Sequence, residues 1–149
     1  MMKQAFKPAI FIALVFAAYA CKTITPVTNA TFLSAGDGAI TVRSSGVGKT
    51  QEKAQIAAEQ NAFNTLFFRG FPESQQKTPL VGYDEAGAKQ QHATYFDDLY
   101  GNRRYRTFVT QSHTAGSYDK TLQSVEITIN LRALRADLER AGVIRKFGY

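Results

Sequence analysis

The sequence is poor in cysteine, histidine and long apolar runs: among 149 residues it has one cysteine and two histidines. A lone cysteine cannot form an internal disulfide bond. The main apolar run, Ala9–Ala18, contains ten residues, whereas a membrane-spanning helix needs roughly 20. These absences argue against a disulfide-bonded scaffold and against a permanent transmembrane segment.

The first residues have the layout of a secretion signal. Lys3 and Lys7 precede the apolar run, and Ala18-Tyr19-Ala20 satisfies the small-x-small rule for signal cleavage. With Cys21 added, the same residues resemble a bacterial lipobox. An unpaired thiol has no obvious use in an oxidising compartment. We therefore predict that residues 1–20 are a signal peptide and that Cys21 is a lipid attachment site. The alternative is a free N-terminal cysteine after ordinary secretion.

The residue after the cysteine and the net charge bear on location and partners. Lys22 stands where some bacteria place an aspartate for inner-membrane retention, so we predict a lipid-anchored cell-envelope protein at the outer membrane. A secreted or soluble periplasmic protein is the alternative. Several acyl chains, such as palmitate, anchor a protein stably. Loss of Lys3 and Lys7 lowers the formal net charge from +6 to +4. This mild excess suits lipid phosphates, an anionic polysaccharide or an acidic envelope protein; neither nucleic acid nor a cofactor is expected.

The mature chain has the size of one domain. Removing residues 1–20 from 149 leaves 129, within the usual domain range. Residues 21–38 lack sustained periodicity and are rich in small polar residues, which predicts a tether. Residues 39–149 are then a single α+β domain.

Alternation and helical periodicity predict the elements of this domain. Thr50 is a good N-cap, and glycines at 70 and 142 are typical of helix ends. The predicted fold is β-α-(short helical insertion)-β-β-α, with a small three-stranded sheet and helices on one face. The predicted strands cover residues 39–43, 104–113 and 124–131, and the predicted helices cover 51–69, 89–100 and 131–141.

One segment imitates a phosphate-binding loop. Gly46-Val47-Gly48-Lys49-Thr50 lies between a predicted strand and a predicted helix. A P-loop requires a further glycine where this chain has Arg43, because backbone amides must wrap the phosphates there. We interpret the two glycines as a tight strand-to-helix turn and predict no nucleotide site.

A second segment mixes cations with aromatic rings, as many polyanion-binding surfaces do. The alternative is structural packing, with Asp97 and Asp98 neutralising the arginines and the rings forming a small core. We call the residues that carry this candidate ligand or partner surface the basic-aromatic surface: Tyr95, Tyr100, Arg103, Arg104 and Arg106.

The sequence shows no catalytic or metal-binding constellation. A metal site would need His92 and His113 together with carboxylates such as Asp97. His92 and Asp97 are five residues apart, which is not the spacing of three or four that aligns side chains on a helix. No Gly-x-Ser-x-Gly elbow is present. We predict no metal site, no catalytic residues and no enzymatic activity.

The order of elements is similar to that of a known family. A strand, Gly46-x-Gly48, a helix with alanines at 54, 58 and 62, two further strands and a helix resemble small bacterial envelope lipoproteins and the related N-terminal domain of the flagellar assembly protein FlgT. The resemblance covers residues 39–70 and 104–142, and residues 71–102 depart from it. It implies an α+β domain serving envelope assembly or interaction, without catalytic residues. Flagellar function does not follow, because a shared fold does not determine function.

These observations together predict a non-enzymatic cell-envelope lipoprotein that binds or scaffolds another envelope component. One alternative is a carbohydrate- or lipid-ligand-binding module that uses the basic-aromatic surface. The other is a secreted enzyme of unknown type, because an active site assembled from distant residues leaves no motif.

Overall fold

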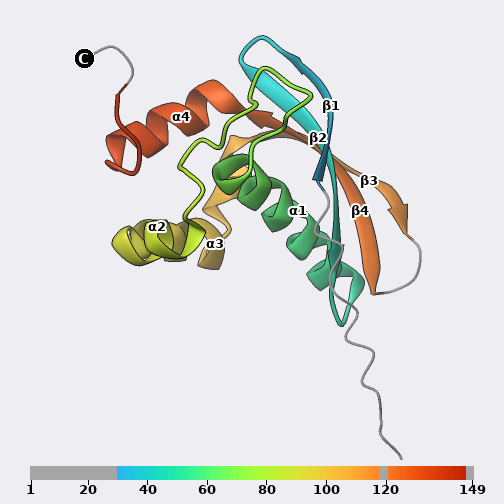
Figure 1. Cartoon of the computed structure of the whole chain (residues 1–149). Helices are drawn as coiled ribbons and strands as arrows, with labels where there is room; N and C mark the ends of the chain where they lie inside the picture. Colours follow the sequence, from blue (N-terminus) through green and yellow to red (C-terminus); the bar gives the residue numbers. More distant parts are fainter. Residues whose placement is uncertain (1–29, 118–120, 147–149) are drawn as a thin grey trace, which may run out of the picture.

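A computed structural model describes residues 30–117 and 121–146, which form a four-stranded antiparallel sheet and four α-helices (Figure 1). The predicted α+β class is confirmed. None of the helices in this part of the chain has the length and apolarity needed to cross a membrane. The strands are β1 (Ala30–Gly36), β2 (Ala39–Val47), β3 (Val109–Ser117) and β4 (Leu122–Asn130), in the order β1-β2-β4-β3. The helices are α1 (Gln51–Phe68), α2 (Glu85–Gln91), α3 (Ala93–Gly101) and α4 (Leu131–Arg140), and a short 3-10 helix, η1 (Arg104–Phe108), precedes β3.

The sheet has one strand more than the three that the sequence predicted. The additional strand, β1, lies inside the segment 21–38 that was predicted to be a tether, so that prediction is wrong from residue 30 onward. Asp37 and Gly38 join β1 to β2 in a two-residue turn with positive φ at both positions. An Asp-Gly pair favours such a turn. Ala30 and Phe32 then pack partly buried against the core, which holds the strand in the sheet.

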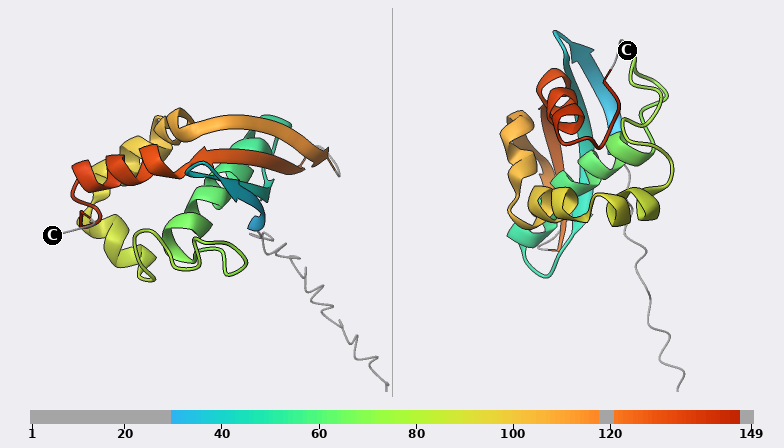
Figure 2. Two further views of the ribbon diagram at one scale, coloured as in Figure 1. Left: turned by 90° about the horizontal axis from the view of Figure 1, so that it is seen from above. Right: turned by 90° about the vertical axis from the view of Figure 1, so that its left-hand side faces the viewer.

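Helix α1 lies against one face of the sheet (Figures 1 and 2). Its N-cap is Thr50, as predicted, whose Oγ1 accepts a hydrogen bond from the backbone N–H of Lys53 at 3.3 Å. A Cβ placed on Gly46 would lie 2.1 Å from the backbone nitrogen of Ala58, and one on Gly48 would lie 2.3 Å from that of Ala54. Neither glycine has a positive φ. The two glycines are therefore required for the close approach of α1 to β2, rather than for the conformation of a turn.

The hydrophobic core lies between α1 and the sheet. Val125, Ile127 and Ile129 of β4 point toward α1 and are fully buried, as their alternation predicted. Ile40 and Val42 of β2 lie beside them, and the bulky C-terminal half of α1 covers this apolar face. The alanines at 54 and 58 thus allow close packing near the start of α1, whereas Phe63 and Phe67 pack their rings near its end.

The insertion between α1 and β3 differs from the prediction in two places. The single helix predicted over 89–100 is divided at His92, which ends α2 and begins α3. The strand predicted from Arg104 begins at Val109, because residues 104–108 form η1. Phe96 of α3 contacts Phe67 and Phe68 of α1 through its ring, so the insertion shares the main core.

The opposite face of the sheet is polar, and both edge strands are irregular. On this open face Arg43 forms an ion pair with Glu126, and His113 Nε2 lies 2.9 Å from the second carboxylate oxygen of Glu126. The edge strand β1 has a register shift between Phe32 and Ser34, and the edge strand β3 has two, at 109–111 and 114–116. Such bulges interrupt the row of backbone groups that an edge offers to another strand.

Candidate binding groove

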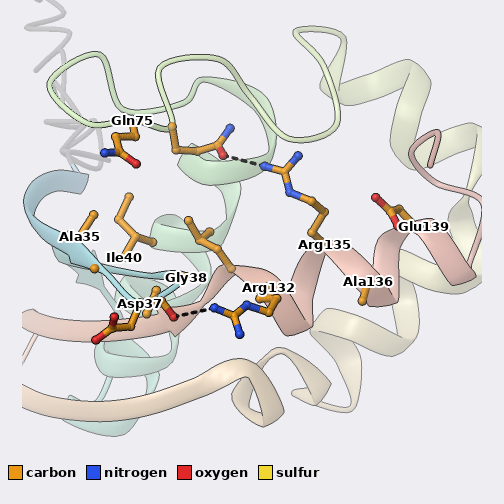
Figure 3. A pocket seen from close by; sticks show the side chains of 13 residues that line it. Ala35, Asp37, Gly38, Ile40, Gln75, Arg132, Arg135, Ala136 and Glu139 are labelled. Atoms are coloured by element: carbon orange, nitrogen blue, oxygen red, sulfur yellow. Dashed lines mark hydrogen bonds between the residues drawn. The ribbon is translucent and has the colours of Figure 1, made fainter. Parts of the chain in front are cut away.

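A groove of about 780 Å³ lies where the β1–β2 turn, a loop and α4 meet (Figure 3). Residues 35–40 form one wall, Gln75 and Gln76 form a second, and one face of α4 forms the third. These three segments are far apart in the sequence. The groove therefore exists only because β1 joins the sheet and the loop before α2 folds back toward α4.

The sequence of α4 determines which side chains line the groove. Asn130 caps the helix, with its Oδ1 accepting a hydrogen bond from the backbone N–H of Ala133 at 3.0 Å. Leu134 and Leu138 are fully buried beneath the helix. Residues three and four apart share one helix face. The face of α4 beside the groove therefore carries Arg132, Arg135, Ala136 and Glu139.

Arg132 is the least neutralised cation of the groove. Its backbone N–H donates to the carbonyl oxygen of Gly38 at 3.1 Å, and its Nη2 donates to the carbonyl oxygen of Asp37 at 3.4 Å. Among the described residues no carboxylate lies within 4.0 Å of its guanidinium. A guanidinium has five N–H donors. Arg132 is thus held against the turn while retaining donors for a ligand.

Arg135 and Gln76 connect the two sides of the groove. Arg135 Nη2 donates to Gln76 Oε1 at 3.0 Å, as the dashed line in Figure 3 shows. Gln76 is itself fixed, because its backbone N–H donates to Ser74 Oγ at 2.9 Å and its carbonyl oxygen accepts from the N–H of Phe71 at 2.8 Å. The loop wall is therefore a built part of the domain, tied to the buried Ser74.

The structure brings part of the predicted basic-aromatic surface together, around Arg104. Its guanidinium lies 4.9 Å from the ring centre of Tyr95, and it forms ion pairs with Asp98 and Asp137. The Tyr95 hydroxyl also donates to Asp137, at 2.9 Å. Burial raises the pKa of Tyr95, and the bond to the Asp137 carboxylate raises it further. The charge of Arg104 is thus neutralised within the domain. The packing interpretation named Asp98 as such a partner, and Asp137 is a second one.

The other members of the basic-aromatic surface point toward α1. Arg106 Nε and the Tyr105 hydroxyl both donate to Oε2 of Glu59, at 2.8 Å and 3.0 Å, and Glu59 is only 3% exposed. Burial beside this carboxylate raises the pKa of Tyr105 to about 12. The Tyr100 hydroxyl donates to Oδ1 of Asn64, and Arg103 lies 3.5 Å from Glu52.

The three arginines of the basic-aromatic surface, Arg103, Arg104 and Arg106, each have a carboxylate partner. This arrangement favours structural packing over an open cationic surface. Arg103 has the most exposed pairing, because the side chain of its partner Glu52 is 74% accessible.

Two further sequence predictions concern Cys21 and a metal site. Cys21, the predicted lipid attachment site, lies outside the described residues. Within residues 30–117 and 121–146, no cluster of three or more histidine and carboxylate side chains could hold a metal ion. His113 lies beside Glu126 on the open face, and His92 joins α2 to α3.

The sequence did not single out the groove residues Gln76, Arg132 and Arg135. In the helix predicted over 131–141, the leucines at 131, 134 and 138 share one face, and Arg132 and Arg135 lie outside this apolar stripe, which was the available signal. The position of Gln76 follows from the path of the loop, for which no periodic pattern exists. Comparisons of the chain with protein-family models, with curated proteins and with solved structures found no match.

Proposed function

We propose that this protein is a non-enzymatic, lipid-anchored binding domain of the bacterial cell envelope, and that the groove beside α4 holds its partner. The signal sequence and Cys21 support the anchor and the envelope location. Lys22 favours the outer membrane over the inner one. The observation that carries the binding role is Arg132, whose exposed guanidinium lies in the groove, donates to the carbonyl oxygen of Asp37 at 3.4 Å and has no carboxylate partner among the described residues.

The position of the groove supports a partner away from the anchoring membrane. The predicted anchor precedes β1 in the sequence, whereas the groove is lined by residues 35–40 at the end of β1 and the start of β2. Figure 1 shows the turn between these two strands. Seven residues of strand extend for about 20 Å. The groove is thus separated from the start of the folded domain by the length of this strand, and it can face a component that does not belong to the anchoring bilayer.

Site-specific photo-crosslinking in the native cells tests this proposal. Ala136 and Ala133 are both exposed alanines of α4, but only Ala136 lines the groove. A photoreactive amino acid at position 136 should form an adduct with an envelope component, and one at position 133 should not. The Arg132→Gln substitution should abolish the adduct at 136. Equal adducts at both positions, or none at 136, would contradict the proposal.

A further inference from the structure

Lys89 of α2 contacts two aromatic rings and a carboxylate. Its Nζ lies 5.3 Å from the ring centre of Tyr100 in α3 and 5.6 Å from that of Phe68, the last residue of α1. The same atom lies 2.7 Å from Oε1 of Glu85, one turn earlier in α2. An ammonium group over a ring face is attracted by the electrons of the ring. Lys89 therefore connects α2 to both α1 and α3.

Helix α2 has little burial to hold it on the domain. It contains seven residues and no buried side chain. A helix of this length is unstable in water unless it packs on other elements. Ala88 packs against the core but is only partly buried. Because burial is the main source of packing energy, the contacts of Lys89 provide a large share of the energy that holds α2 in place.

The chain has a suitable hinge at each end of α2. The N–H groups of Val81 and Gly82 both donate to the carbonyl oxygen of Phe67, at 3.0 Å and 3.3 Å, so the chain is fixed to α1 up to this point. A Cβ placed on Gly82, whose φ is 149°, would have no atom within 4 Å, so the backbone has room to rotate there. At the other end, His92 separates α2 from α3. Residues 83–92 can therefore move as a unit about these two points.

The rings that Lys89 contacts are held in place by α1 and α3 themselves. Phe68 is 3% exposed, and its ring centre lies 5.8 Å from that of Phe96 in α3. The Tyr100 ring stacks on the Phe96 ring with 6.4 Å between their centres, and its hydroxyl donates to Oδ1 of Asn64 in α1. Movement of α2 would thus uncover the faces of Phe68 and Tyr100 without disordering their rings.

We propose that residues 83–92 form a lid that Lys89 holds closed, and that the domain also reaches an open state in which the rings of Phe68 and Tyr100 face solvent. The charge of Lys89 sets the balance between the two states, because the rings and the Glu85 carboxylate both attract an ammonium group. None of the residues that line the groove beside α4 belongs to the lid. This inference is therefore independent of the proposed function.

Hydrogen exchange followed by mass spectrometry measures the opening of the lid, with the full mature chain in a non-ionic detergent. Opening exposes amides that are bonded within α2, such as that of Ala88, which donates to the carbonyl oxygen of Asp84 at 3.1 Å. Peptides that cover residues 85–92 should exchange faster than peptides that cover α3, whose Phe96 and Leu99 are buried. Equal protection of the two helices would contradict an independent lid.

Charge variants of Lys89 test the latch. Lys89→Gln removes the charge without weakening the helix itself, because lysine and glutamine have similar helix propensities. It should speed exchange in residues 85–92 about tenfold, through loss of the ring contacts and the ion pair, and leave α3 within twofold. Lys89→Arg keeps a cation and should exchange like the unsubstituted protein. The matched control is Lys77→Gln, which removes the same charge from an exposed lysine of the preceding loop and should change nothing in α2.

Exposure of the rings gives a second measurement. A soluble gadolinium chelate should broaden the proton signals of the Phe68 and Tyr100 rings more strongly in Lys89→Gln than in the unsubstituted protein. Unchanged broadening would overturn the proposed open state. Equally fast exchange in Lys89→Arg would show that the positive charge is not what holds the lid, and a similar rise in Lys77→Gln would show an unspecific effect of charge. Equal acceleration of α3 would show that a larger unit opens and that His92 is not a hinge.

Discussion

Replacing Gly46 by alanine should strongly destabilise the domain. The new Cβ would lie 2.1 Å from the backbone nitrogen of Ala58, 2.5 Å from the carbonyl oxygen of Ala54 and 2.6 Å from the carbonyl carbon of Ala57. All three are backbone atoms of α1, so no side-chain rotation relieves the overlap. To restore ordinary contact, α1 must move away from β2 until the shortest separation rises from 2.1 to about 3.4 Å.

A displacement of this size affects the whole core. Helix α1 buries Ala54, Ala58, Phe63 and Leu66 against the sheet, and a gap of about 0.5–1 Å already forfeits a quarter to a half of each dispersion contact. Overpacking in a core typically costs about 1–3 kcal/mol. Because the overlap here joins two main chains, we expect a loss of about 3 kcal/mol. The entropic gain of a glycine-to-alanine change, about 0.4–1 kcal/mol, does not offset it.

Urea unfolding followed by circular dichroism measures this loss. With a slope of about 1–3 kcal/mol per molar urea, the midpoint of Gly46→Ala should fall by at least about 1 M. The matched control is Gly36→Ala, which also lies in a strand but has nothing within 4 Å of the added Cβ and no positive φ. Its midpoint should remain unchanged or rise slightly. The double substitution Gly46→Ala, Ala58→Gly should not recover stability, because the overlap involves the backbone. Equal stabilities of the Gly46 and Gly36 variants would refute the reasoning.

Three other substitutions give independent tests. Ser44→Ala should raise the free energy of unfolding by about 1 kcal/mol, because the Ser44 hydroxyl is buried with no hydrogen-bond partner among the described residues; a loss of stability in urea unfolding would contradict this. Cys21→Ala should move the protein from the membrane to the soluble fraction, and intact mass should show a diacylglycerol adduct only when Cys21 is present. An unmodified cysteine in the native protein would contradict the predicted lipid anchor. Hydrogen bonds from Arg43 and His113 hold the pKa of Glu126 below its ordinary value, so its stabilising effect is present at neutral pH and is lost as the pH falls through the acid range. Glu126→Gln should therefore flatten the dependence of the unfolding midpoint on pH between about 5 and 3, and an unchanged slope would contradict it.

The elements with regular periodicity were predictable from the sequence, and those determined by tertiary contacts were not. Strict alternation identified β4, and the alanine spacing with Thr50 identified α1. In β1 the register shift after Phe32 interrupts the alternation, so the Asp37-Gly38 turn was the only clear signal of the hairpin.

Residues 104–108 alternate like a strand but form η1. Tyr105 is buried there, and both Tyr105 and Arg106 donate to the carboxylate of Glu59, which lies 46 and 47 residues away from them in the chain. No local pattern indicates a buried carboxylate at that position. The groove was hidden for a similar reason, because Arg135 meets Gln76 only through the path of an irregular loop.

With the proposed lipid anchor, the bulges in β1 and β3 would affect how closely copies of the protein can lie on a membrane. Proteins held by lipid anchors share a thin layer, where their effective concentration is far higher than in solution. In such a layer an uninterrupted edge strand would invite sheet-to-sheet polymerisation between neighbours. The register shifts at both ends of this sheet interrupt that pairing, so the domain is suited to dense display with its groove left available to a different molecule.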